Sequence, residues 1–173
     1  YLRNRGIDDT DIYNWGIGFG DGEDQTFMNT KSKITFPIHD YNGDIISFTG
    51  RVPFGPTVLA QLNEKQKAEG KRTTPKYDHR WPLNPKYVDK QMIDNHPYPE
   101  FDRNQYLYGI SHAKSYIRQW GSATIVEGFT DVIGLHKHGI RNAVATMGTN
   151  LSEQHVTLLM RAGAKRILLM RDG

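Results

Sequence analysis

Short apolar runs alternate with helical patterns in the last third of the chain. The apolar runs within 123–127, 142–146 and 165–172 have the length of buried strands, and apolar residues recur at helical spacing between them. Strands that alternate with helices predict a parallel sheet in β-α-β-α-β order. Because the third run is almost wholly apolar, we expect it to be a central strand covered on both faces.

The residues before 121 predict a lobe of mixed α+β structure. Asn42-Gly43 is a strong hairpin-turn signal between two strand patterns. Five prolines between residues 75 and 99 predict an extended surface loop. The expected elements are a helix at 8–14, hairpin strands at 34–38 and 44–50, and helices at 58–68 and 106–119.

Composition bounds the class of protein. With 173 residues, 37% of them hydrophobic, the chain can form one compact domain or two small lobes. The aromatic residues Tyr13, Trp15 and Phe19 are expected in its core. No apolar run approaches the ~20 residues of a membrane span, and the N-terminus does not resemble a signal peptide. The absence of Cys fits a reducing cytoplasm and excludes a cysteine zinc site within this chain.

Positive charge is concentrated in the middle of the chain. Residues 1–50 hold 4 basic and 8 acidic side chains, whereas residues 51–90 hold 9 basic and 4 acidic ones. Phe54, Tyr77 and Trp81 lie among those Lys and Arg residues, a combination that suits a single nucleic-acid strand held by phosphate contacts and base stacking. A solvated loop with ordinary surface charge explains the same pattern equally well.

Two of the predicted parallel strands run into carboxylates. Glu127 follows the first strand, Asp131 comes one helical turn later, and Asp172 follows the third strand. Because the carboxyl ends of parallel strands meet at one sheet edge, these acids predict a site for Mg²⁺ or Mn²⁺ that serves phosphate chemistry. Asp131 can instead complement the helix dipole, and Glu127 can instead transfer a proton or order the site.

The order of the motifs resembles a known family. Glu127-Gly-Phe-Thr-Asp131, the stretch 143–149 and Asp172-Gly173 are similar to the Toprim domain of bacterial and phage DnaG-type DNA primases. Upstream stretches are similar to successive motifs of the primase polymerase core, a series that is not expected in topoisomerases or small Toprim nucleases. These stretches are 1–7, 31–38, 43–51 and 106–109. Insertions and departures from the pattern indicate a divergent member, with a phage source as one interpretation.

The resemblance implies an α/β fold in two parts. Residues 1–120 would form the basic N-terminal lobe of the polymerase core, and residues 121–173 a Toprim domain that is incomplete at its C-terminus. The implied function is DNA-templated synthesis of short RNA primers for replication by metal-dependent nucleotidyl transfer. The implied partners are a single-stranded DNA template, ribonucleoside triphosphates and, through a region outside this chain, the replicative helicase. No membrane partner is expected, and the expected location is the cytoplasm, or the host cytoplasm for a phage protein.

The resemblance also assigns roles to single residues. The catalytic, metal-binding acids would be Glu127, Asp131 and Asp172, with the second aspartate of the family's Asp-x-Asp pair expected after Gly173. Arg51 is expected to project beside these acids. The implied nucleotide- and nucleic-acid-binding cations are Lys31, Lys33, Arg51, Lys86, Lys76 and Arg103.

Four of these basic positions, Lys76, Lys86, Lys31 and Lys33, differ from a simple match to the family. The family's Pro-Lys-Tyr motif occurs twice, and its spacing favours Lys86, with Lys76 in reserve. Lysines stand at positions 31 and 33 where the family has arginines, which keeps the charge but loses the bidentate geometry.

Two other functions stay open. A Toprim nuclease uses similar acids to cleave phosphodiesters, and the segment can also be a non-catalytic fragment that binds single-stranded nucleic acid. Ribonucleotide incorporation on a single-stranded template separates polymerase from nuclease. A histidine metal site is not expected, because His136 and His138 point to different helix faces. His155 is expected to pack or form a hydrogen bond within its helix.

Overall fold

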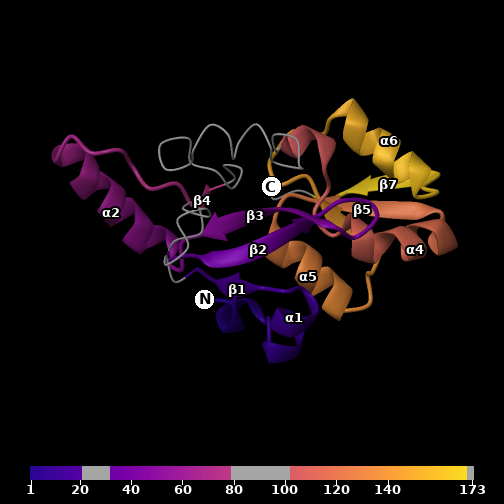
Figure 1. The fold of residues 1–173 in the computed structure, drawn as a ribbon, viewed down its shortest axis with the longest axis horizontal. Helices are drawn as coiled ribbons and strands as arrows, with labels where there is room; N and C mark the ends of the chain where they lie inside the picture. The colour runs from indigo at the N-terminus through magenta and orange to yellow at the C-terminus, as the bar shows by residue number, and fades with distance from the viewer. Residues whose placement is uncertain (21–31, 79–101, 171–173) are drawn as a thin grey trace, which may run out of the picture.

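A computed structural model describes residues 1–20, 32–78 and 102–170 of the chain. An antiparallel sheet of order β1-β2-β3-β4 lies next to a parallel sheet of order β6-β5-β7, with helices packed around them (Figure 1). The predicted α/β class, with a hairpin lobe before a parallel sheet, is confirmed. The described elements are η1 (Arg3–Arg5), α1 (Asp9–Asn14), β1 (Gly18–Phe19), β2 (Ile34–His39), β3 (Ile45–Arg51), α2 (Pro56–Ala68), β4 (Tyr77–Asp78), η3 (Arg103–Gln105), α4 (Ile110–Trp120), β5 (Ser122–Val126), α5 (Phe129–Lys137), β6 (Ala143–Ala145), α6 (Glu153–Arg161) and β7 (Arg166–Leu169).

The N-terminal lobe begins with a capped helix and a hairpin. Asp8 and Asp11 cap α1 reciprocally, because each carboxylate accepts the backbone N–H of the other residue at 3.0 Å. In the turn between β2 and β3, Asp40 accepts the backbone N–H groups of residues 42–44 at 2.8 to 2.9 Å. Gly43 adopts a φ of +110°, which a side chain would disfavour. The predicted hairpin and its turn are confirmed.

Helix α2 extends away from the two sheets (Figure 1). It begins at Pro56, two residues before the predicted start, because proline fits the first turn of a helix. Thr74 ties the returning chain to this helix, since its N–H donates to Asn63 Oδ1 at 2.7 Å. No helix within the described residues, α2 included, is long and apolar enough to cross a membrane. Residues 79–99 of the predicted loop lie outside the described residues.

The central strand of the parallel sheet is not the predicted one. β5 pairs with β6 on one side and β7 on the other, and its buried residues reach only 5% exposure. β7 is an edge strand within the described part of the chain, and Leu168 and Leu169 are 51% and 53% exposed. Within the described residues, the covered central strand is therefore β5 and not β7. An apolar run indicates a strand that is stable when both of its faces are buried. The order of the strands in the sheet decides which strand is buried in this way.

Helix α4 begins later than predicted. Tyr108 exchanges two backbone hydrogen bonds with Ala145 at 2.9 and 3.0 Å, which adds an antiparallel bridge to the edge of β6. Gly109 then turns the chain with a φ of +83°, and the helix begins at Ile110. Residues 106–109 are not helical as predicted, because the backbone of Tyr108 pairs with the sheet.

One aromatic core joins the two sheets. Phe36 from β2 packs on Phe129 at the start of α5, with ring centroids 5.2 Å apart. Tyr108 contacts the same Phe129 ring at 4.6 Å, and Trp15 stacks on Tyr108 at 5.5 Å. All four residues are buried. The N-terminal lobe and the parallel sheet therefore share their interior.

Two aromatic residues predicted for this core lie on the surface instead. Tyr13 is 86% exposed and Phe19 is 61% exposed, whereas Trp15 is buried as predicted. Tyr13 lies on the outer face of α1, and Phe19 on the outermost strand of the antiparallel sheet. Hydrophobicity favoured the core, but neither position faces it.

Candidate active site

Two of the three predicted catalytic acids lie together at the carboxyl end of β5. Glu127 directly follows the strand, and Gly128 leads into α5, whose first turn carries Asp131. The Asp131 carboxylate folds back over Gly128, since a Cβ built on that glycine would lie 2.5 Å from Asp131 Oδ2. A side chain at position 128 would therefore displace this carboxylate.

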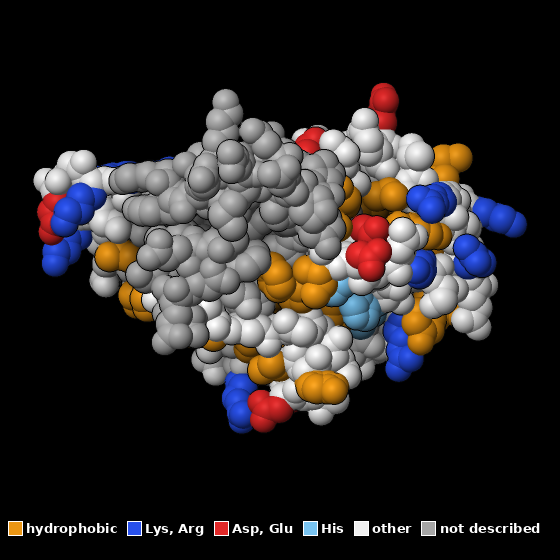
Figure 2. Space-filling model, in the orientation of Figure 1, with side chains coloured by type: hydrophobic (Ala, Val, Ile, Leu, Met, Phe, Trp, Pro, Cys, Tyr) orange, Lys and Arg blue, Asp and Glu red, His pale blue; other side chains and the backbone are white. Residues whose placement is uncertain are grey.

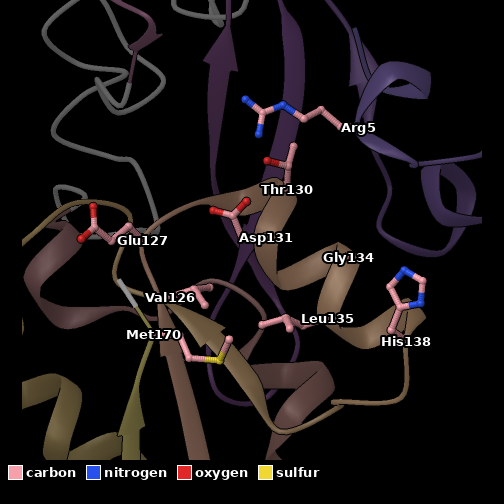
Figure 3. A pocket seen from close by; sticks show the side chains of 9 residues that line it. All are labelled: Arg5, Val126, Glu127, Thr130, Asp131, Gly134, Leu135, His138 and Met170. Carbon is pink, nitrogen blue, oxygen red and sulfur yellow. The ribbon is translucent and has the colours of Figure 1, made fainter. Parts of the chain in front are cut away.

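Glu127 and Asp131 line a cavity of about 390 Å³ that follows one side of α5 (Figure 3). Val126, Leu135 and Met170 form the apolar part of this cavity. A second hollow of about 270 Å³ is lined by the same two acids and continues toward β4. Both acids are half-buried, so they stand at the junction of two solvent-accessible hollows.

Cationic side chains border both hollows. Arg5 lines both, and Figure 3 shows it across from Asp131, with Thr130 between them. Lys76 lines the second hollow. Lys76 is one of the cations predicted from the sequence, as the reserve to Lys86. Arg5 is not among them, because Arg5 and Asp131 lie far apart in the sequence. The signal that could have found Arg5 is its place in the stretch 1–7, which resembles the start of the primase core.

Arg51 does not project beside the acids as predicted. The residue is 2% exposed, and its guanidinium carbon lies 3.4 Å from the ring centroid of Tyr1 and 5.6 Å from that of Tyr77. Arg51 Nη1 donates to the Val52 carbonyl at 2.6 Å, and Nε has no hydrogen-bond partner among the described residues. Cation–π contacts with the two rings replace hydration and hold the side chain under the N-terminal segment. Arg51 does not line the second hollow itself, but the rings of Tyr1 and Tyr77 that it contacts both do.

Tyr77 connects Arg51 with the acids. Burial raises the pKa of Tyr77 to about 12, with a further rise from nearby Tyr1 and Asp131 and an opposing effect of Arg51. The Tyr77 ring also packs on Phe129 at 5.3 Å. At neutral pH this phenol is therefore protonated and uncharged.

A buried hydrogen-bond network holds Arg103 beside the second hollow. A Cβ built on Gly148, which lines the hollow, would lie 3.3 Å from Arg103 Nη1. Buried His155 Nδ1 accepts the Ser152 N–H at 3.2 Å, so the ring proton is on Nε2 and donates to the Arg103 carbonyl at 2.8 Å. The hydrogen-bonding role predicted for His155 is confirmed.

The other predicted cations and the third acid are not among the described residues that line the two hollows. Lys31, Lys86 and Asp172 lie outside the described residues. Lys33 is half-buried just before β2 and lines neither hollow. The structure thus brings Glu127 and Asp131 together with Lys76 and places Arg103 at the edge. Arg51 lies against two rings that line the second hollow, and Lys33 lines neither hollow.

The donor atoms of the cluster fit a hard divalent cation. Glu127 and Asp131 offer the carboxylate oxygens that Mg²⁺ and Mn²⁺ prefer. The close approach to Gly128 fixes the position of the Asp131 carboxylate. Within the residues that the structure describes, no three His, Cys, Asp or Glu side chains lie close enough to hold a metal ion. A third protein ligand would have to come from elsewhere, which is the role predicted for Asp172.

Comparisons with known proteins agree with this geometry. Residues 121–173 match the Toprim domain family. The DNA primase of Helicobacter pylori strain J99 is 31% identical over 173 residues, which cover 99% of this chain and 25% of that protein. A solved DNA primase domain from Pseudomonas aeruginosa is 28% identical, with a TM-score of 0.65 over 98% of this chain and 52% of that one. The chain belongs to the DnaG-type primase family.

The chain spans about a quarter of the length of the curated primases it matches first, 25% and 24%. The fold is also that of a DnaG primase catalytic domain solved bound to single-stranded DNA, with a TM-score of 0.63 and 23% identity over 98% of this chain and 53% of that one. The Helicobacter and Pseudomonas relatives are bacterial. A phage source stays a prediction.

Proposed function

We propose that this primase segment belongs to a catalytic core that makes short RNA primers on a single-stranded DNA template by metal-dependent nucleotidyl transfer. The observation that carries the proposal is that Glu127 and Asp131 border one hollow together with the cations Arg5 and Lys76. Joining a nucleoside triphosphate to a 3′-hydroxyl requires hard oxygen ligands for a divalent ion and fixed cations for the phosphates. This hollow offers both.

The four charged side chains of the hollow each have a role in this proposal. Glu127 and Asp131, with Asp172, would hold Mg²⁺ or Mn²⁺, and that ion would neutralise negative charge on the triphosphate. Arg5 binds phosphate oxygens through its planar, bidentate guanidinium, and Lys76 binds them as a point charge. The ion held by the acids and the cations Arg5 and Lys76 would then contact the same triphosphate.

The remaining predicted cations extend this binding surface. Arg103 lies at the edge of the hollow and is proposed to contact template phosphates. Arg51 is proposed to act indirectly, by holding the Tyr1 and Tyr77 rings that line the hollow. Lys31, Lys33 and Lys86 stay predicted nucleotide or template contacts.

The proposal extends to the whole protein. It includes the division into residues 1–120 and 121–173, a contact with the replicative helicase through a region outside this chain, and ribonucleoside triphosphates as substrates. Because priming requires access to template DNA, it also places the protein in the cytoplasm, or in the host cytoplasm for a phage protein.

Ribonucleotide incorporation on a single-stranded template tests the proposal in the full-length protein that contains this segment. Glu127→Gln and Asp131→Asn should each lower primer synthesis about a hundredfold or more, because they remove charged ligands from the site. Glu64→Gln on the exposed face of α2 is the matched control and should keep the full rate. Wild-type product from the Glu127 variant would contradict the proposal.

The same assay separates the other two functions. Cleavage of the single strand without incorporation of ribonucleotides would indicate a Toprim nuclease. Binding of the strand with neither reaction would indicate a non-catalytic nucleic-acid-binding protein.

A further inference from the structure

Charges of opposite sign lie at opposite ends of the parallel sheet. From residue 103 to residue 170 the chain has 8 Lys and Arg residues and 3 acids, which are Glu127, Asp131 and Glu153. All three acids follow the carboxyl ends of strands, in the turn after β5 or in the first turns of α5 and α6. Most of the basic residues lie at the other end, where the helices end and the strands begin.

Four cations define this end, which we call the strand-start surface: Arg118, Arg141, Lys165 and Arg166. Arg118 is in the last turn of α4, Arg141 precedes β6, Lys165 precedes β7, and Arg166 is its first residue. The backbone N–H groups of residues 165 and 166 both donate to the Gly121 carbonyl, at 2.9 and 3.2 Å, which brings the start of β7 to the end of α4. Figure 2 shows Lys and Arg side chains gathered over the side of the molecule where Figure 1 places α4 and the start of β7.

Two aromatic rings belong to the same surface. Trp120, the last residue of α4, is 41% exposed and lies 5.6 Å from the ring of Tyr116. Arg141 Nη1 donates to the Tyr116 hydroxyl at 2.7 Å and thereby holds a guanidinium beside these rings. Exposed tryptophan next to cations is the combination that binds unpaired bases and their phosphates.

Ion pairing with carboxylates does not account for these charges. A basic residue in the last turn of a helix complements the helix dipole, which explains Arg118. Arg141, Lys165 and Arg166 are not in helices, and within the described residues they make no salt bridge with a carboxylate. All three are exposed. Their positive potential is therefore available to a ligand.

We propose that the strand-start surface binds a single nucleic-acid strand, as a second site apart from the acidic hollow. A strand of five residues separates the two, a length of about 13 to 16 Å, so one oligonucleotide can reach both ends of the sheet. The cations contact phosphates, and Trp120 with Tyr116 stacks on bases. This site goes beyond the proposed function, since the binding requires neither metal nor nucleotide.

Fluorescence anisotropy of this chain with a labelled single-stranded oligonucleotide, without metal or nucleotide, tests the site. Lys165→Gln combined with Arg166→Gln should weaken binding on the order of tenfold at about 50 mM salt and lower the salt slope by about 0.7 per lost phosphate contact. Thr10→Glu combined with Tyr13→Glu, on the exposed face of α1, changes the net charge equally and should change the affinity by less than about twofold. Circular dichroism confirms that both variants fold.

A separate variant tests the role of the Trp120 ring in base stacking. Trp120→Ala should weaken binding of the single strand by about fivefold or more and binding of a duplex much less, because only unpaired bases stack on a side chain. Three results overturn the proposal: unchanged affinity in the Lys165 and Arg166 variant, an equal loss in the α1 control, or poly-glutamate binding as tightly as DNA with no effect of Trp120→Ala. The last result would assign the surface to an acidic protein. Loss of primer synthesis in the Glu127 variant is a separate outcome, because that variant keeps the strand-start surface intact.

Discussion

At the scale of single residues, the site depends on the lack of a side chain at Gly128. Gly128 has a φ of −110°, which any residue can adopt, so its backbone conformation does not require glycine. What requires glycine is the Asp131 carboxylate, whose Oδ2 would lie 2.5 Å from a Cβ at this position. The sequence motif placed Asp131 near Glu127, and the close approach over Gly128 explains why the residue between them is small.

Gly128→Ala should therefore lower catalysis far more than stability. The Asp131 carboxylate must rotate away from the added methyl group, and a displacement of about 1 Å in a reacting site costs on the order of a hundredfold in rate. The free energy of unfolding should change by less than about 1 kcal/mol, because the carboxylate can turn toward solvent. Gly55→Ala before α2, where a Cβ meets open space, is the control. Primer synthesis and urea unfolding measure the two effects, and full activity in the Gly128 variant would contradict the assigned place of Asp131.

His155 is a second residue whose role is set by its hydrogen bonds. His155→Ala should lower the free energy of unfolding by about 1 to 3 kcal/mol, because it leaves the Ser152 N–H and the Arg103 carbonyl without their partner in a buried place. The control Met160→Ala changes a side chain of the same helix that is 66% exposed, and should cost much less. Urea denaturation followed by circular dichroism compares them. Equal losses in the two variants would show that the His155 network contributes nothing specific.

At the scale of elements, local signals in the sequence predicted local structure, and pairing over a long distance escaped them. Asn42-Gly43 predicted the hairpin turn, which forms between β2 and β3. Strand order determines the exposure of β7, and edge pairing forms the bridge between Tyr108 and Ala145. Both features join residues that are far apart in the sequence, so a local pattern cannot predict them. The candidate site shows the same contrast between local and long-range features. Glu127 and Asp131 are close in the sequence and were predicted together, whereas Arg5 is brought to them only by the fold.

Packing between elements also controls a titrating group. His136 on α5 lies edge-on against Trp15, with centroids 5.0 Å apart, and its Nε2 donates to the Ala143 carbonyl at 2.9 Å. Burial lowers the pKa of His136 to about 4, the charges of His112 and Arg141 lower it further, and the Ala143 hydrogen bond opposes the shift. Burial likewise lowers the pKa of His112, which stacks on Trp15 at 4.4 Å.

Stability should therefore fall as the pH falls from about 6.5 to about 4. Between these pH values the unfolded chain binds a proton on His136 and the folded chain does not, so protonation favours unfolding. Above pH 6.5 His136 is neutral in both states, and the folded chain has its full stability. For His136 alone the loss is on the order of 2 to 3 kcal/mol. His136→Gln should lose less stability than the parent chain between pH 7 and pH 4.5, whereas His138→Gln, at an exposed position, should follow the parent. Urea unfolding at the two pH values decides, and parallel losses in all three proteins would exclude the role of His136.

At the scale of the whole molecule, the two sheets share an interior that the proposed division at residue 120 does not separate. Phe36 belongs to the antiparallel sheet, yet its ring packs on Phe129 of α5, and Ile7 and Trp15 from the N-terminus are buried in the same cluster. The acids stand on the parallel sheet, and the cations Arg5 and Lys76 come from the other lobe. A shared core is what fixes the distance between acids and cations.

Phe36→Ala should consequently destabilise both lobes together. The residue is fully buried, and removing such a ring costs about 3 to 5 kcal/mol. Because β5 and α5 pack against the same cluster, hydrogen exchange of the β5 amides should accelerate along with that of the β3 amides, and both should report one cooperative transition. Phe19→Ala, at a position 61% exposed on β1, provides the control and should leave both sets of amides nearly unchanged. If Phe36→Ala accelerates exchange in β3 while β5 keeps its protection, the two sheets unfold independently, and the fixed arrangement of acids and cations needs a different cause.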